Sequence, residues 1–116
     1  MKAIEREKIQ PILDAWTGQE LYLHLETTNG AYAAHRSQGS AVVCAYIRNG
    51  RIRYVRGEVT GFGPYRVGLK MEDGWVYAEG LTDWELDSDG RLLLAGHDQE
   101  GRLAVALHLS HSPFSI

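Results

Sequence analysis

The chain has 116 residues, of which 44% are hydrophobic and 23% are charged, and its formal net charge is −3. This length and composition indicate a single small, soluble domain, residues 1–116, with one modest core. Basic residues are in excess in the first half and acidic residues in the second. The chain therefore lacks the overall basic excess of a nucleic-acid-binding protein.

The N-terminal residues 1–8 are mostly charged and contain no apolar signal-peptide segment. No apolar run approaches the roughly 18 residues that a membrane span requires. The single cysteine, Cys44, excludes an intrachain disulfide. These features predict a cytoplasmic protein that does not bind a membrane.

One amphipathic helix is predicted near residues 7–17. Ile9, Ile12, Leu13 and Trp16 recur at the spacing of one helical face. Proline has no N–H to donate and is best tolerated in a first turn, so the position of Pro11 places the helix start near residue 7 or 8. A glycine at position 18 is a suitable stop.

The chain after residue 18 consists of short segments with apolar alternation, separated by Asn-Gly and Asp-Gly turns. The predicted strands are 20–28, 31–36, 41–48, 51–58, 65–70, 75–81, 84–87, 92–97 and 103–110. About nine strands at this spacing predict an all-β (mainly β) fold. We expect an antiparallel, barrel-like meander, with the N-terminal helix covering one opening or edge.

The first predicted hairpin suggests a cluster of polar side chains. A two-residue turn at Asn29-Gly30 places His24 opposite His35, with Glu26 on the same face. Two imidazoles and a carboxylate can hold a metal such as zinc or act in general acid–base catalysis. The alternative is a polar face whose histidines hydrogen-bond to their neighbours.

The second predicted hairpin suggests an anion-binding face. A turn at Asn49-Gly50 places three arginines and a tyrosine together, and arginine forks suit carboxylate or phosphate groups. The candidate residues are Tyr46, Arg48, Arg51 and Arg53. Alternatively, acidic residues such as Glu58 or Glu79 neutralise these arginines, or the arginines protect an exposed strand edge.

Two further regions allow more than one interpretation. The loop 61–66 contains glycines but lacks the spacing and following helix of a phosphate-binding loop. Around it, Tyr65, Arg66, Tyr77 and Glu79 either line a pocket or are simply outward-facing residues. The three tryptophans are interpreted as core residues or as anchors for the helix.

Five segments in this order resemble the YojF-like family of small uncharacterised bacterial proteins. They are residues 22–28 (YLHLETT), 45–49 (AYIRN), 63–70 (GPYRVGLK), 75–82 (WVYAEGLT) and 91–97 (RLLLAGH). The resemblance implies a cytoplasmic protein of unknown function with no accepted catalytic residues. It also implies a link to low-molecular-weight thiol metabolism, because in such genomes the gene often lies beside a deacetylase of bacillithiol synthesis.

The sequence favours a non-enzymatic module that binds a small anionic metabolite or a partner enzyme, because polar Arg, Tyr and His faces occur without a catalytic signature. One alternative is a small metal-assisted enzyme that uses His24, His35 and Glu26. Another is a structural homo-oligomer subunit that pairs through strand edges. The sequence identifies no cofactor and leaves open whether the protein is an enzyme.

Overall fold

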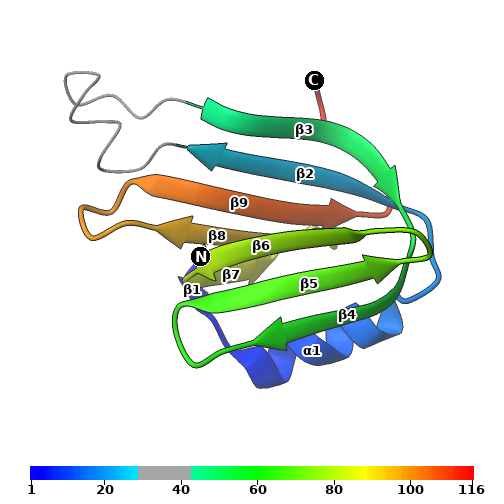
Figure 1. Cartoon of the computed structure of the whole chain (residues 1–116), viewed down its shortest axis with the longest axis horizontal. Helices are drawn as coiled ribbons and strands as arrows, with labels where there is room; N and C mark the ends of the chain where they lie inside the picture. The colour runs from blue at the N-terminus through cyan, green and yellow to red at the C-terminus, as the bar shows by residue number, and fades with distance from the viewer. Residues whose placement is uncertain (29–42) are drawn as a thin grey trace.

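The computed structural model describes residues 1–28 and 43–116, which form one helix and two antiparallel sheets (Figure 1). The elements are β1 (Lys2–Ala3), α1 (Arg6–Ala15), β2 (Leu21–Thr28), β3 (Val43–Ile52), β4 (Tyr54–Thr60), β5 (Tyr65–Met71), β6 (Trp75–Leu81), β7 (Asp83–Leu86), β8 (Leu92–His97) and β9 (Leu103–Ser110). The large sheet has the order β1-β7-β8-β9-β2-β3, and the small sheet the order β4-β5-β6. The mainly β fold with an N-terminal helix is confirmed, but the described strands form two sheets instead of a closed barrel.

The core lies between the two sheets, and apolar residues at alternate strand positions build much of it. Leu23 of β2 pairs with Leu109 of β9, so apolar side chains from neighbouring strands share the inner face. In the small sheet, Val67 and Leu69 of β5 likewise point to the inner face, and both are fully buried. Side chains between these positions therefore face outward on both sheets.

Helix α1 covers the outer edge of β4 (Figure 1). Ile9 and Leu13 are completely buried against the core. The Gln10 amide donates a 2.8 Å hydrogen bond to the Gly57 carbonyl and accepts a 2.9 Å bond from the Val59 N–H. Gln10 thus satisfies backbone groups that a neighbouring strand would otherwise pair, which protects the edge.

The helix begins slightly earlier than predicted. It starts at Arg6, so Pro11 lies in the second turn and not in the first. Position 11 then lacks the backbone bond to the Glu7 carbonyl, a loss that the burial of the apolar face offsets. This helix has ten residues, and no helix among the described residues is long and apolar enough to span a membrane.

The predicted hairpin turn at Asn49-Gly50 is wrong, because β3 continues through it. Leu23 pairs with Gly50 and His24 pairs with Arg48, so Asn49 is the extra residue of a β-bulge. Asn49 has φ 60°, a left-handed conformation that asparagine tolerates. The turn predicted at residues 29–30 and the strand predicted at 31–36 lie outside the described residues.

The two sheets come into direct backbone contact at a pair of glycines. A Cβ added to Gly96 of β8 would overlap the backbone carbonyl of Gly80 in β6. The chain also passes directly between the sheets nearby, from β6 to β7 through Thr82. Gly96 therefore allows a backbone-to-backbone contact that any side chain would prevent.

Replacing Gly96 by alanine tests this contact. We expect Gly96→Ala to lower the free energy of unfolding by more than about 3 kcal/mol, because a rigid backbone must move to admit the methyl group. Chemical denaturation measures the change. Gly74→Ala is the matched control, since a Cβ there meets Met71 at an ordinary 3.6 Å. Equal stabilities of the two variants would contradict the close approach.

Candidate functional site

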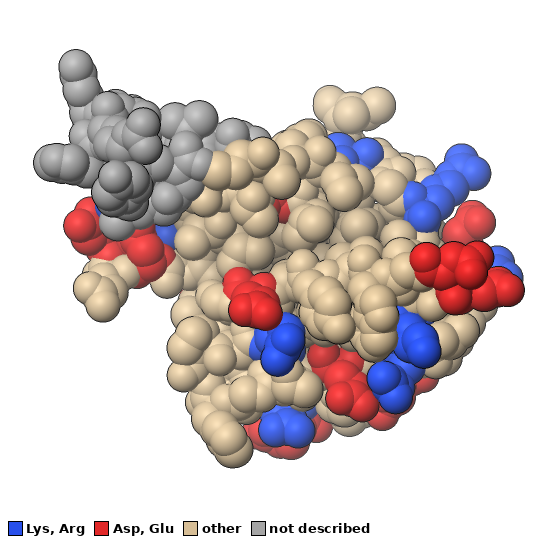
Figure 2. All heavy atoms as spheres, viewed as in Figure 1, with Lys and Arg blue, Asp and Glu red and all other residues tan. Residues whose placement is uncertain are grey.

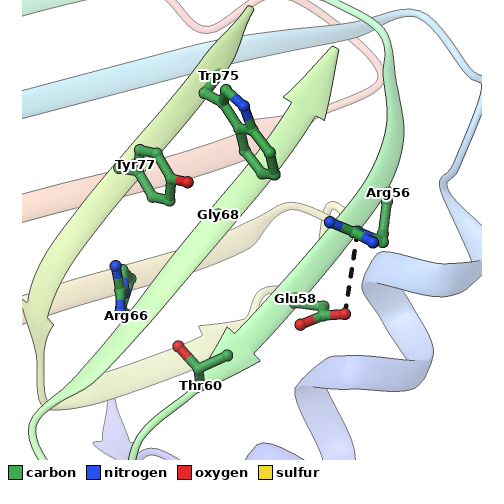
Figure 3. Close-up of a pocket in the computed structure, with 7 residues that line it drawn as sticks. All are labelled: Arg56, Glu58, Thr60, Arg66, Gly68, Trp75 and Tyr77. Atoms are coloured by element: carbon green, nitrogen blue, oxygen red, sulfur yellow. Dashed lines mark ion pairs between the residues drawn. The ribbon is translucent and has the colours of Figure 1, made fainter.

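The outer face of the small sheet is hollowed around a glycine, in what we call the β4–β6 pocket. Gly68 pairs with Glu58 on one side and with Tyr77 on the other, so the centre of the three strands carries no side chain. The pocket has a volume of ≈ 220 Å³. It is lined by Arg56, Glu58, Thr60, Arg66, Gly68, Trp75 and Tyr77 (Figure 3).

A β-bulge turns the β4 side chains toward this pocket. Tyr54 pairs with Met71 and Arg56 pairs with Lys70, which leaves Val55 as the extra residue. The buried Tyr54 and the exposed Arg56 therefore face opposite ways although they are two positions apart. The bulge places the Arg56 guanidinium on the outer face.

Trp75 and Tyr77 of β6 form an exposed aromatic stack at one side of the pocket. Their ring centroids are 5.2 Å apart and their planes differ by 10°. Trp75 is 46% exposed and Tyr77 is 50% exposed. The Tyr77 ring leans over Gly68, where an added Cβ would lie 3.0 Å from Tyr77 Cε1. Glycine at position 68 thus keeps the ring in place and the floor open.

Two arginines at the pocket have guanidinium groups with loose partners. Arg56 Nε lies 4.0 Å from Glu58 Oε1, and Arg66 Nη1 lies 3.5 Å from Glu79 Oε1. Both distances exceed those of strong charge-assisted hydrogen bonds, and all four side chains are more than half exposed. Exposed pairs of this kind contribute little to stability, so the guanidinium groups remain available to a ligand.

Basic groups surround the aromatic stack. Arg56 and Lys70 lie 6.0 and 5.7 Å from the Trp75 ring centroid, and Arg66 lies 5.8 Å from that of Tyr77. In the space-filling view, charged side chains surround an uncharged patch on this face (Figure 2). The arrangement can attract an anion and also offer it an aromatic surface.

The structure brings most of the sequence-predicted site residues together on the other sheet. His24 pairs with Arg48, Glu26 with Tyr46, and Tyr22 with Arg51, so these side chains share the outer face of β2 and β3. The two clusters predicted on separate hairpins are therefore neighbours. Arg53 lies apart from them as an exposed residue between β3 and β4.

The predicted register around His24 is wrong. The ladder positions on either side of His24 are held by Arg48 of β3 and His108 of β9. The predicted turn at Asn29-Gly30 would pair His24 with residue 35, but Arg48 and His108 hold the two positions beside His24. His35 itself lies outside the described residues.

His24 is a buried histidine with an acidic neighbour. The residue is 5% exposed, and its Nε2 lies 3.2 Å from Glu26 Oε1. Its Nδ1 is buried without a hydrogen-bond partner among the described residues. His108 and Phe114 lie against the same ring, with centroids 5.2 and 6.3 Å away. Within residues 1–28 and 43–116, no three His, Cys, Asp or Glu side chains could hold a metal ion together.

The arginines of this face are engaged by the chain itself. Arg48 donates from Nε and Nη2 to the Ser115 carbonyl, at 3.1 and 2.7 Å. Arg51 lies over the Tyr22 ring, 5.7 Å from its centroid. The predicted neutralisation of these arginines by Glu58 or Glu79 is wrong, because those carboxylates lie beside Arg56 and Arg66 of the small sheet.

Sequence reasoning identified part of the β4–β6 pocket and missed the rest. Arg66 and Tyr77, which were expected either to line a pocket or to face outward, do line it. Arg56 was not singled out, and the interpretation of Trp75 as a core or helix anchor is wrong, whereas Trp84 is buried. The apolar alternation of β5 could have located the outward face of this strand. Val67 and Leu69 are buried, which implies that residues 66, 68 and 70 face outward.

The partly buried imidazole of His108 predicts a dependence of stability on pH. Burial, together with the neighbouring His24, Arg48 and Arg91, lowers the pKa of His108 from 6.5 to about 4. The unfolded chain therefore takes up a proton first, so this contribution is complete above about pH 6.5 and is lost as the pH falls toward 4. We expect a loss of roughly 1–2 kcal/mol, after allowing for partial solvent exposure.

Urea denaturation at a series of pH values measures this loss. His108→Gln should remove this component of the acid sensitivity, whereas His111→Gln, at an exposed position, should retain it. An identical pH dependence in the parent and in His108→Gln would show that His108 ionises in the folded protein as it does in the unfolded chain.

Comparison with known proteins identifies the family but supplies no activity. The family described as "Protein of unknown function (DUF1806)" matches residues 3–114. "Uncharacterized protein YojF" of Bacillus subtilis (strain 168) is 48% identical over 116 residues, which is the full length of both chains. The crystal structure of Bacillus subtilis YojF superposes with a TM-score of 0.84 and 44% identity, covering 99% of this chain and 97% of that one. The chain therefore belongs to the DUF1806 family, as its resemblance to YojF-like proteins implied.

Proposed function

We propose that this protein is a non-enzymatic binding module that holds a small anionic ligand in the β4–β6 pocket. The observation that carries the proposal is the pair of loosely partnered guanidinium groups, Arg56 and Arg66, beside a floor opened by Gly68. Arginine binds carboxylate and phosphate groups with two parallel hydrogen bonds. The sequence also predicted a small anionic ligand, but at the arginines of the large sheet. We instead propose the small sheet as its site.

The charge balance around the pocket supports this choice. Arg56, Arg66 and Lys70 face two carboxylates, Glu58 and Glu79, which leaves one positive charge in surplus. The whole chain, by contrast, has a net charge of −3. A local positive surplus on an acidic protein directs small anions to this face.

The alternative functions have less support from the described residues. The His24–Glu26 contact suits proton transfer, but the His24 side chain is buried and therefore poorly accessible to a substrate. The metal site that also includes His35 remains a prediction, as do a homo-oligomer, a partner enzyme and the link to thiol metabolism.

Matched arginine variants test the proposal. With inorganic phosphate as the probe, we expect Arg66→Gln to weaken binding roughly tenfold or more, since it removes a charge-assisted hydrogen bond. Arg51→Gln makes the same charge change on the other sheet and should leave binding unchanged. NMR titration of the backbone amides measures both affinities and locates the probe.

Two results would contradict the proposal. Weaker phosphate binding in Arg51→Gln than in Arg66→Gln would assign the anion site to the outer face of β2 and β3. Amide shifts spread over the surface, with equal affinities in the parent and Arg66→Gln, would show that phosphate has no site in the pocket.

A further inference from the structure

We infer that the ligand of the β4–β6 pocket carries a flat conjugated ring joined to its anionic group, and that this ring stacks on an outer face of the Trp75–Tyr77 pair. The inference rests on the proposed function, because it names the class of anion that the pocket takes. It is carried by the exposed aromatic stack, which an anion site alone does not require.

The aromatic stack lies in an unusual position for two such large rings. Each residue leaves about half of its surface in water, at 46% for Trp75 and 50% for Tyr77. Adjacent exposed aromatic rings on a sheet characterise sites that bind ring-shaped ligands, because every flat conjugated ring can stack on them. The two planes are nearly parallel, at 10°, with centroids 5.2 Å apart, so the rings stack on each other and the pair leaves its outer faces for a ligand.

The positions of the cations match a ring that bears a negative group. Arg66 lies 5.8 Å from the Tyr77 ring centroid, and Arg56 lies 6.0 Å from that of Trp75. A ligand ring against the stack therefore has a guanidinium group within reach of its anionic substituent. The same guanidinium groups can also contact the ligand ring through cation–π attraction.

The size of the pocket limits the ligand. Its volume of ≈ 220 Å³ is below the about 300–1,000 Å³ that is common for sites of drug-sized molecules. It accommodates a ring or an anionic group with its linker, while the remainder lies over the open aromatic surface. Gly68 sets this volume, because any side chain there would meet Tyr77.

Three probes separate the ring from the anion. AMP contains both, adenosine lacks the anion, and ribose 5-phosphate lacks the ring. We expect AMP to bind at least about tenfold more tightly than ribose 5-phosphate, since stacking of one base contributes this much. We expect adenosine to bind more weakly than AMP. NMR titration gives the affinities, and the Trp75 indole N–H reports the stacking.

Matched variants assign the two contributions. Trp75→Leu should weaken AMP binding about tenfold and leave ribose 5-phosphate binding unchanged, whereas Arg66→Gln should weaken the binding of both phosphates. Tyr46→Leu is the control, because it removes an aromatic ring from a residue that is 57% exposed on the other sheet. If Trp75→Leu does not fold, Tyr77→Leu tests the same surface.

The outcomes separate the inference from the proposed function. Equal affinities for AMP and ribose 5-phosphate, both reduced by Arg66→Gln, would overturn the flat ring and leave the anion site standing. No binding of either phosphate in the pocket would overturn both. Tighter binding of AMP that Trp75→Leu abolishes, with Tyr46→Leu unchanged, would establish the inference.

Discussion

The contact between Gly80 and Gly96 is the constraint on which the two-sheet arrangement depends. It brings β6 and β8 together without intervening side chains, at the place where the chain crosses from the small sheet to the large one. The small sheet therefore has one face against the core and one face in water. Every residue of the β4–β6 pocket lies on the second face, so the pocket follows from how the sheets meet.

The sequence predicts most of the secondary structure, because apolar alternation is a direct consequence of one-sided burial. It fails at Asn49-Gly50, where the dipeptide forms a bulge and not a hairpin turn. Both features need a left-handed backbone conformation, so residue type cannot separate them. A hairpin turn at these two residues would pair Arg48 with Arg51, whereas in the structure both arginines pair with residues of β2.

The candidate site was less predictable than the fold, since a ligand site depends on which strands are neighbours. His24, Glu26, Tyr46 and Arg48 were correctly recognised as members of polar faces, but the face that they share requires the β2–β3 register. The position of Arg56 depends on the bulge at Val55, for which the sequence contains no recognisable signal. Lys70 opposite Trp75, by contrast, follows from the turn at residues 71–74 and could have been derived.

A purely structural explanation of the aromatic stack is incomplete. Tyr77 covers Gly68, and an aromatic ring over a glycine restores contacts that the glycine lacks in a strand. This contact explains the ring of Tyr77 but does not explain why position 68 is a glycine. A glycine at the centre of a sheet is itself destabilising. Trp75 pairs with Lys70, and the edge of its ring also reaches Gly68, where its Cζ3 lies 3.8 Å from an added Cβ. The ligand that we propose accounts for all three residues together, since it needs an open floor beside an exposed aromatic face.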